Sequence, residues 1–345
     1  MGLDIGTSCL KAVIVEETLR GLRVSQCREV SFRLGPDPME RREAFVEAVA
    51  RLVPETDLES VQVITAIPSH QVSWHRLELP FGRFRQVARV VRYEVAQNVP
   101  YELEDVVTDF FIPAVDRHGG AVVRAVCVAR ERLLAYRDLL QETCIVPAEI
   151  TAEALAMYYS YLAQEPAPPE GTVGLLDIGA SKTTVCIVRG GGFFAASSIY
   201  KGGDWVTRRL ADDLGVSFEE AEEMKLHPDP AGQPAVDRAY ENFLTSLGDS
   251  IEHCLVAHTS PHGGPENLAE VVVGGGCARA PRVLDFLGKR LGASVRLANP
   301  FEGLATGLFV PAHVAGPLSH IATGLALAAS YRGKARIDLQ RAALH

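Results

Sequence analysis

The chain contains the same strand–turn–strand pattern twice. The segments LDIGTSCLKAVIV (3–15) and LDIGASKTTVCIV (176–188) share Leu, Asp, Ile, Gly, Ser, Ile and Val at matching positions. In each copy an apolar run leads into a turn of Gly and small residues, and a β-branched run follows, which is typical of a hairpin. Because the copies lie half of the 345-residue chain apart, they predict two halves of related fold.

The rest of the chain supports this division. The Pro-rich stretch QEPAPPEG (164–171) predicts a linker, so we expect a first lobe over 1–170 and a second over 171–345. Strands alternate with helices in both halves, which indicates a layered α/β fold. Residues 76–145 differ: a helix between two prolines, two strands and a further helix near Arg130 predict a small α+β subdomain inserted into the first lobe.

Composition narrows the class of protein. A net charge of -9 argues against a nucleic-acid binder, which needs clustered Lys and Arg. The seven cysteines form no C-x-x-C pair, which is typical of reduced thiols in cytoplasm. No signal peptide or spanning helix is predicted, so we expect neither export nor an integral membrane chain. His253, His258 and His262 lack zinc-site spacing and are expected at the surface.

The repeated turns predict a phosphate-binding site. Gly and small hydroxyl residues in a tight hairpin expose backbone N–H groups, and two facing hairpins can hold a polyphosphate. Asp4 and Asp177, just before the turns, are placed to bind Mg²⁺ through its waters, and Lys11 adds positive charge. The remaining candidates of the two turns are Gly6, Thr7, Ser8, Gly179, Ala180, Ser181 and Thr183. The alternative for a single copy is an ordinary strand and turn.

A run of three glycines ends a later apolar strand. Gly274, Gly275 and Gly276 follow three valines and precede a helix that begins near Pro281. Without side chains, this run predicts a flat backbone shelf on which a base and ribose can lie, next to a helix N-terminus. Neither a Walker A motif nor G-x-G-x-x-G is present.

The segment KGGDWVTRRLADDLGVSFEEAEEMK (201–225) predicts two helices. Ser217 and Glu220 form a capping box for the second helix, on which Glu222 and Lys225 share a face. The alternative interpretation of this acidic stretch is a solvated helix with a weak ion pair.

These elements together resemble the actin, Hsp70 and sugar-kinase superfamily. GLDIGTSCLKAVIV, the 201–225 segment, VVVGGGCARAPRVLDFLGKRLGASVRLANPFEGL and ATGLALA are similar to the PilM family of type IV pilus assembly proteins. The resemblance implies an actin-like (ribonuclease H-like) two-lobed ATPase fold whose inserted subdomain is similar to those of FtsA and the cytoplasmic part of the type II secretion protein GspL. It also implies that Gly202, Gly203, Glu222 and Lys225 lie near the sugar and base of the nucleotide.

The same resemblance implies a function. We expect an ATP- and Mg²⁺-binding cytoplasmic platform at the inner membrane that docks a PilN-like subunit, with a pilus or secretion motor ATPase as a further partner. Any ATPase activity is slow at most. The alternatives are a GspL-like scaffold that has lost nucleotide binding and a small-molecule kinase of the same superfamily. Ala180 replaces the hydroxyl that Thr7 supplies in the first turn, and FFAASSIYKGG lacks the arginine often found before the paired glycines.

Three further features have open alternatives. Glu153 is a candidate for the group that activates water, or else a surface carboxylate. Arg85, Arg89 and Arg92 form a basic helix face that is either solvated or contacts an acidic partner or lipid headgroups. The tail ARIDLQRAALH (335–345) resembles the I-N-L motif that opens PilN, which suggests that the chain normally continues toward, or was cut before, a membrane-spanning partner segment.

Overall fold

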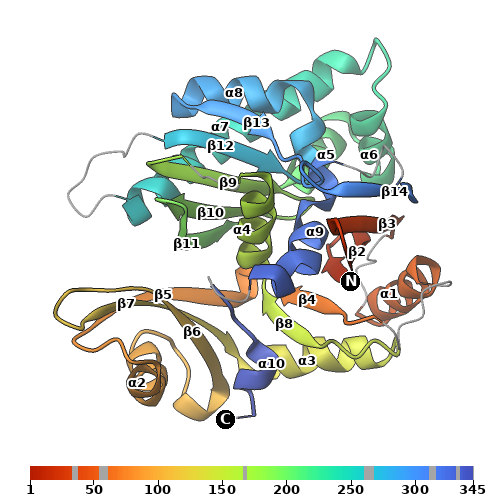
Figure 1. Cartoon of the computed structure of the whole chain (residues 1–345). Coiled ribbons are helices and arrows are strands. Elements are labelled where there is room, and N and C mark those ends of the chain that lie inside the picture. Colours follow the sequence, from red (N-terminus) through yellow and green to blue (C-terminus); the bar gives the residue numbers. More distant parts are fainter. Residues whose placement is uncertain are drawn as a thin grey trace.

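The computed structural model describes residues 1–32, 38–53, 61–165, 169–259, 268–310, 316–331 and 335–344. Within these residues the strands form three sheets, of which two belong to the large lobes and one to an inserted module (Figure 1). Residues 166–168 of the predicted linker lie outside the described residues. No helix of the described part is long and apolar enough to cross a membrane.

The first sheet has the strand order β14-β3-β2-β1-β4-β8. Strands β1 to β3 form an antiparallel meander, and β4 pairs in parallel with β1 and β8. The strands are β1 (Gly2–Ile5), β2 (Cys9–Thr18), β3 (Gly21–Ser31), β4 (Ile64–Ile67), β8 (Glu149–Ala152) and β14 (Ala305–Phe309). Helix α1 (Pro38–Leu52) packs on this sheet through Phe45, Val49 and Leu52, all buried.

The second sheet has the order β11-β10-β9-β12-β13. Its strands are β9 (Thr172–Ile178), β10 (Thr183–Arg189), β11 (Gly192–Ile199), β12 (Leu268–Gly274) and β13 (Ser294–Leu297). Figure 1 shows the helices of this lobe on the outer side of the sheet. They are α5 (Gly203–Leu214), α6 (Phe218–Leu226), α7 (Gln233–Thr259) and α8 (Pro281–Leu291). The sheets divide near the predicted boundary, except that β14 from the second half returns to pair with β3.

Two helices lie between the large sheets (Figure 1). Helix α4 (Glu153–Gln164) is buried along most of its length, and α9 (His320–Leu327) crosses it. A Cβ at Gly324 of α9 would lie 1.8 Å from the carbonyl oxygen of Ala156, so only glycine permits this helix crossing. Helix α9 is therefore buried.

The inserted module contains the helix, the two strands and the further helix that the sequence predicts, together with one more strand, which begins at Val72, before the predicted boundary at 76. Its sheet has the order β5-β7-β6, and α2 packs on one face through Val87, Val91 and Val95. The elements are β5 (Val72–Leu79), α2 (Phe84–Ala96), β6 (Val106–Val115), β7 (Ala121–Ala129) and α3 (Arg130–Gln141). Trp74 of β5 packs on Phe193 of β11, with ring centroids 4.5 Å apart, so the module also contacts the second lobe.

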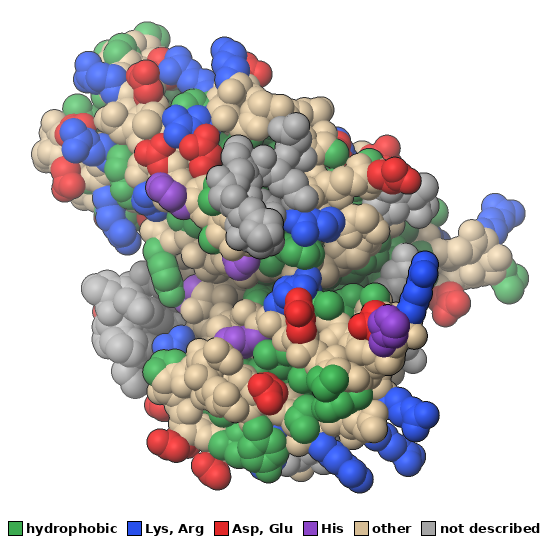
Figure 2. Space-filling model, turned by 90° about the vertical axis from the view of Figure 1, so that its left-hand side faces the viewer, with side chains coloured by type: hydrophobic (Ala, Val, Ile, Leu, Met, Phe, Trp, Pro, Cys, Tyr) green, Lys and Arg blue, Asp and Glu red, His purple; other side chains and the backbone are tan. Residues whose placement is uncertain are grey.

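The surface of the module combines apolar and basic side chains. Phe84, Tyr93 and Tyr101 are exposed, and the predicted arginine face of α2 is also exposed. Figure 2 shows hydrophobic side chains gathered on the lower part of the visible face, with Lys and Arg near its edge. Short 3-10 helices complete the fold: η1 (Ser69–Gln71), η2 (Leu103–Asp105), η3 (Gly276–Arg279), η4 (Pro317–Ser319) and η5 (Ala328–Tyr331), followed by a single-turn helix α10 (Leu339–Ala342).

Candidate functional site

The two repeated segments form equivalent hairpins. Asp4 is paired with Lys11 across β1 and β2, and Asp177 is paired with Thr184 across β9 and β10, in the same register. Each turn is closed in the same way: the Gly6 N–H donates to the Cys9 carbonyl at 3.1 Å, and the Gly179 N–H to the Lys182 carbonyl at 2.9 Å. The sequence repeat is therefore a structural repeat.

The hairpins meet at their turns. The Thr7 hydroxyl donates to the Ser181 hydroxyl across the two lobes, with 3.2 Å between the oxygens. Both side chains are accessible to solvent. Because the hydroxyls are in direct contact, they must separate before a phosphate group can lie between them.

A buried carboxylate lies at the base of each hairpin. Asp4 and Asp177 are both 8% exposed. The Lys11 ammonium lies 3.3 Å from Oδ2 of Asp4. Burial raises the pKa of Asp4, although Lys11 opposes the shift, and the charges of Glu153 and Asp177 add to it. The two acidic residues therefore influence each other electrostatically.

His320, which the sequence analysis missed, pairs with the second carboxylate. Its Nε2 lies 2.8 Å from Oδ1 of Asp177. Burial by itself would raise the pKa of Asp177, but the hydrogen bond and charge of His320, with the charges of Lys11 and Lys182, hold it below its ordinary value. Only the Ser-His step at the start of an apolar helix marks His320 in the sequence, and that signal is weak.

Contacts within the protein explain two of the three glycines at 274–276. A Cβ at Gly274 would lie 2.4 Å from Nε2 of His320, and a Cβ at Gly275 would lie 2.5 Å from the carbonyl oxygen of Ile178. Gly275 also has φ +89°, which side chains disfavour. At Gly276 a Cβ would meet only Leu318, at 3.9 Å. Two of the three glycines thus accommodate protein atoms, and Gly276 is the one that borders open space.

The paired glycines bring α5 to the second turn. The N–H groups of Gly203 and Asp204 donate to the carbonyls of Gly179 and Ala180, at 2.9 and 2.8 Å. A Cβ at Gly202 would lie 2.4 Å from the Ala180 oxygen, so this approach requires glycine. Gly202 and Gly203 are therefore adjacent to the repeated turn.

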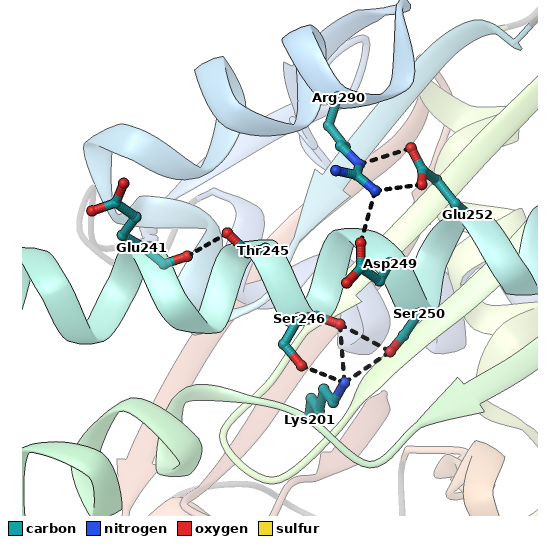
Figure 3. Close-up of polar contacts among 8 residues, drawn as sticks. All are labelled: Lys201, Glu241, Thr245, Ser246, Asp249, Ser250, Glu252 and Arg290. Atoms are coloured by element: carbon teal, nitrogen blue, oxygen red, sulfur yellow. Dashed lines mark hydrogen bonds and ion pairs between the residues drawn. The ribbon is translucent and has the colours of Figure 1, made fainter.

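Lys201, also missed by the sequence analysis, fixes this loop to α7 (Figure 3). Its Nζ donates to the Ser246 carbonyl at 2.9 Å, the Ser246 hydroxyl at 2.6 Å and the Ser250 hydroxyl at 2.9 Å. Arg290 of α8 pairs with Asp249 and Glu252 of the same helix, both at 2.7 Å. Helix α7 thus holds both the glycine-pair loop and the helix that follows the triple glycine.

Glu222 and Lys225 form the predicted pair, and the capping box of Ser217 and Glu220 is present. The Lys225 ammonium lies 2.6 Å from Glu222, and it also donates to the Thr207 hydroxyl at 2.8 Å and the Gly203 carbonyl at 3.3 Å. The Lys225 side chain is 7% exposed, so the solvated alternative is wrong for this pair. The pair supports the glycine-pair loop from the side of α6.

Glu153 begins α4 close to the first carboxylate. It lines a small cavity together with Asp4, Pro68 and Ile321, among other residues. Its Oε2 accepts the Ser69 N–H at 2.7 Å and forms an ion pair with Lys182 of the second turn. The side chain is buried, so the surface-carboxylate alternative is wrong. The activation of water by Glu153 stays a prediction.

The remaining candidates are placed as follows. Ser8 is exposed at the first turn. Thr183 is buried, and its hydroxyl donates to the Lys201 carbonyl at 2.8 Å, so it supports the loop. The structure thus gathers the two turns, the glycine pair, Gly276 and both carboxylates in one region.

The donor set fits a hydrated magnesium ion. The ion pairs of Asp4 and Asp177 use one oxygen of each carboxylate, Oδ2 and Oδ1 respectively. The second oxygen of each is of the type that Mg²⁺ accepts, directly or through water. The Thr7 and Ser181 hydroxyls and the turn N–H groups are suited to phosphate oxygens.

Two lobes with matching hairpins and facing turns, and a glycine-rich strand end beside them, define an actin-like fold. A family model described as "Type IV pilus assembly protein PilM" matches residues 2–330. The chain therefore belongs to the PilM family.

Solved structures agree on the fold. A PilM-PilN type IV pilus biogenesis complex is similar with a TM-score of 0.82 and 22% identity, covering 94% of this chain and 97% of that chain. The ethanolamine utilization protein EutJ from Carboxydothermus hydrogenoformans is similar with a TM-score of 0.53 and 18% identity, covering 94% of this chain and 88% of that chain. MreB 5 of Spiroplasma citri bound to AMPPNP is similar with a TM-score of 0.52 and 12% identity, and the match covers 93% of each chain.

Proposed function

We propose that this member of the PilM family binds Mg-ATP between its two repeated turns and serves as a cytoplasmic platform at the inner membrane, where it docks a PilN-like subunit. The contact of Thr7 with Ser181, above Asp4 and Asp177, carries the nucleotide part of the proposal. The similarity to MreB 5 bound to AMPPNP and to a PilM-PilN complex supports it. A pilus or secretion motor ATPase is the further partner that we propose.

The residues of the proposed nucleotide site have different roles. The hydroxyls of the two turns, with the turn N–H groups other than those of Gly6 and Gly179, which close the hairpins, hold phosphate oxygens, and Gly276 leaves room for the adenosine. Asp4 and Asp177 hold Mg²⁺, which neutralises phosphate charge when it is bound. Lys182 keeps Glu153 in place, and Glu153 orients water only if that ion pair loosens, so any hydrolysis is expected to be slow.

Nucleotide binding and lobe position are then coupled. Because the Thr7–Ser181 contact joins the lobes directly, a nucleotide between the turns favours a form in which they are further apart. The aromatic contact of Trp74 with Phe193 joins the module to the second lobe, so the same movement is transmitted to the module.

A second candidate function follows from the ion pairs. Lys11 and His320 already contact the two carboxylates, so each carboxylate has a partner inside the protein. This arrangement favours a scaffold of the GspL type that has lost nucleotide binding and acts only by docking.

Calorimetric titration with ATP, in the presence and absence of Mg²⁺, separates the two candidates. Saturable Mg²⁺-dependent heat and a raised melting temperature are expected for the nucleotide-binding platform. Titration without heat, combined with capture of a PilN-like N-terminal peptide, would establish the scaffold instead. Absence of both would contradict the two candidates together.

A further inference from the structure

Two arginine side chains share one aromatic ring where the inserted module meets the second lobe. Figure 1 shows β11 of the second lobe directly above β5 and β7 of the module, and β11 contacts β5. The Arg124 guanidinium of β7 lies over the Phe194 ring of β11, with 4.5 Å between Cζ and the ring centroid. The Arg189 guanidinium of β10 lies over the same ring, at 3.9 Å. We call Arg124, Arg189 and Phe194 the arginine cluster.

A third arginine adds positive charge beside the cluster. Arg76 is the direct partner of Arg124 in the antiparallel pair of β5 and β7. Directly opposite residues point to the same face of a sheet, and like charges at such positions repel. Arg76 forms an ion pair with Glu78, and both of these residues are exposed. Arg76 therefore has a counter-charge, and it lies on the side where the cluster borders solvent.

Arg124 has no such counter-charge. The residue is only 7% exposed, and its Nε has no hydrogen-bond partner. No carboxylate in the described part of the chain forms an ion pair with Arg124. Burial, with the charges of Arg76 and Arg189, lowers the pKa of the Arg124 guanidinium to about 10. The side chain therefore still carries its positive charge at neutral pH.

A buried charge without a counter-charge is unfavourable. Arginine is almost never fully buried unless it is paired, because the charged form loses its contact with water. The Phe194 ring attracts a cation, but it carries no net negative charge and is shared by two guanidiniums. The protein thus brings positive charges of the module and of the second lobe together around a buried donor that has no acceptor.

We propose that the arginine cluster is an anion-binding site whose ligand is the phosphate group of a small soluble compound. The planar guanidinium of Arg124 can donate two parallel hydrogen bonds to phosphate oxygens. The neighbouring charges of Arg189 and Arg76 favour a doubly charged phosphate over a singly charged carboxylate. Because Arg124 is buried between the module and the second lobe, a small soluble phosphate fits this site and a lipid headgroup in a bilayer does not.

The bound phosphate also joins two parts of the molecule. It offsets the repulsion between Arg124 of the module and Arg189 of the second lobe. Phosphate therefore favours the form in which the module is docked on β11.

Titration with inorganic phosphate at constant ionic strength tests the proposal. Calorimetry is expected to show saturable binding to the parent protein, with a raised melting temperature, and acetate is expected to bind more weakly. Arg124→Met is expected to bind phosphate about tenfold more weakly or worse, because the bidentate donor is lost. Arg23→Met, which removes an exposed arginine of the first lobe, is the control and is expected to bind like the parent.

The stability of Arg124→Met distinguishes a binding role from a packing role. In buffer without phosphate, the variant is expected to unfold at the same urea concentration as the parent or a higher one, because a buried charge without a counter-charge is removed. Adding phosphate is expected to stabilise the parent and not the variant. A variant that is less stable than the parent in buffer without phosphate, and that phosphate stabilises equally, would show that Arg124 serves packing alone.

Other results would also overturn the proposal. They are a folded parent that binds no phosphate, a folded Arg124→Met variant that binds it like the parent, and acetate binding as tight as phosphate binding. If Arg124→Met does not fold, parent crystals soaked in tungstate, a phosphate mimic, decide. Anomalous density beside the Arg124 guanidinium is expected, and density only elsewhere, or none, would refute the site.

The inference does not depend on the proposed nucleotide site. Phosphate binding that is lost in Thr7→Val and kept in Arg124→Met would place phosphate at the repeated turns and refute the arginine cluster as its site. Failure of the cluster to bind phosphate leaves the proposed function standing, because neither nucleotide nor a pilus subunit is used in the test.

Discussion

The hydroxyl oxygens of Thr7 and Ser181 lie 3.2 Å apart, although half of the chain separates the two residues. This contact brings two copies of one hairpin face to face, each with a buried aspartate at its base. It also means that the two lobes touch where we propose that a nucleotide binds.

Locking this contact is expected to abolish Mg-ATP binding. Thr7→Cys combined with Ser181→Cys, with Cys9 and Cys144 replaced by Ser, can form a disulfide across the turns. The oxidised protein keeps the phosphate out, and reduction restores binding. Isothermal titration measures both states, and Thr7→Cys alone in the same background is the control. Unchanged binding by the oxidised double variant would contradict our assignment of phosphate to the space between the turns.

Gly274→Ala is expected to lower the free energy of unfolding by about 1–3 kcal/mol. The new methyl group would lie 2.4 Å from Nε2 of His320, so the ring must move and its hydrogen bond to Asp177 is lost. Gly276→Ala is the matched control, because its nearest neighbour is 3.9 Å away, and its unfolding free energy is expected to stay within about 0.5 kcal/mol of the parent. Urea unfolding measures both variants. Equal stability of the two would refute the packing role of Gly274.

The crossing of α4 and α9 predicts a larger effect at Gly324. A Cβ there would lie 1.8 Å from a backbone oxygen that cannot rotate away, so Gly324→Ala is expected to destabilise the protein by about 3 kcal/mol. Gly174→Ala, in the buried strand β9, is the comparison, since its Cβ meets Val271 at an ordinary 3.6 Å. Thermal unfolding of the two variants is the measurement, and a mild effect at Gly324 would show that the helices can separate freely.

His258 predicts a pH dependence of stability. Its Nε2 lies 2.6 Å from the Ser197 hydroxyl, and burial, with the charge of Arg124, lowers the pKa of its imidazole. The unfolded chain therefore binds the proton more readily, so the contribution of His258 is complete above pH about 6.5 and is lost as the pH falls through the lower folded pKa. His258→Gln is expected to flatten the fall in unfolding free energy below about pH 6.5. Parallel curves of unfolding free energy against pH for parent and variant would exclude His258 as a source of the pH dependence.

The sequence predicted those features of the structure that depend on residues close together in the chain. The hairpins of the repeat and the capping box of α6 each depend on residues close together in the chain, and the structure contains them. The inserted module was also recognisable, because prolines and alternating apolar runs bound its elements.

Long-range partners were not predictable from one sequence. His320 reaches Asp177 from an apolar helix, and Lys201 reaches α7 from a loop, with no pattern in their neighbours that indicates these contacts. The prediction that the triple glycine forms a flat shelf for the base and ribose was incomplete for the same reason. The atoms that exclude side chains at Gly274 and Gly275 come from elsewhere in the fold. His258 was expected at the surface, and that expectation was wrong, since the residue is partly buried against Ser197; His262 lies outside the described residues.

The most direct test of the central claim is Mg-ATP calorimetry on Asp4→Asn and Asp177→Asn. Each variant is expected to bind at least tenfold more weakly than the parent, about 1.4 kcal/mol, because a magnesium ligand is lost. Asp213→Asn, an exposed partner of Arg209, is the control and is expected to bind like the parent. Parent-like affinity in both Asp4→Asn and Asp177→Asn, with a cooperative melting transition retained, would contradict a nucleotide site between the repeated turns.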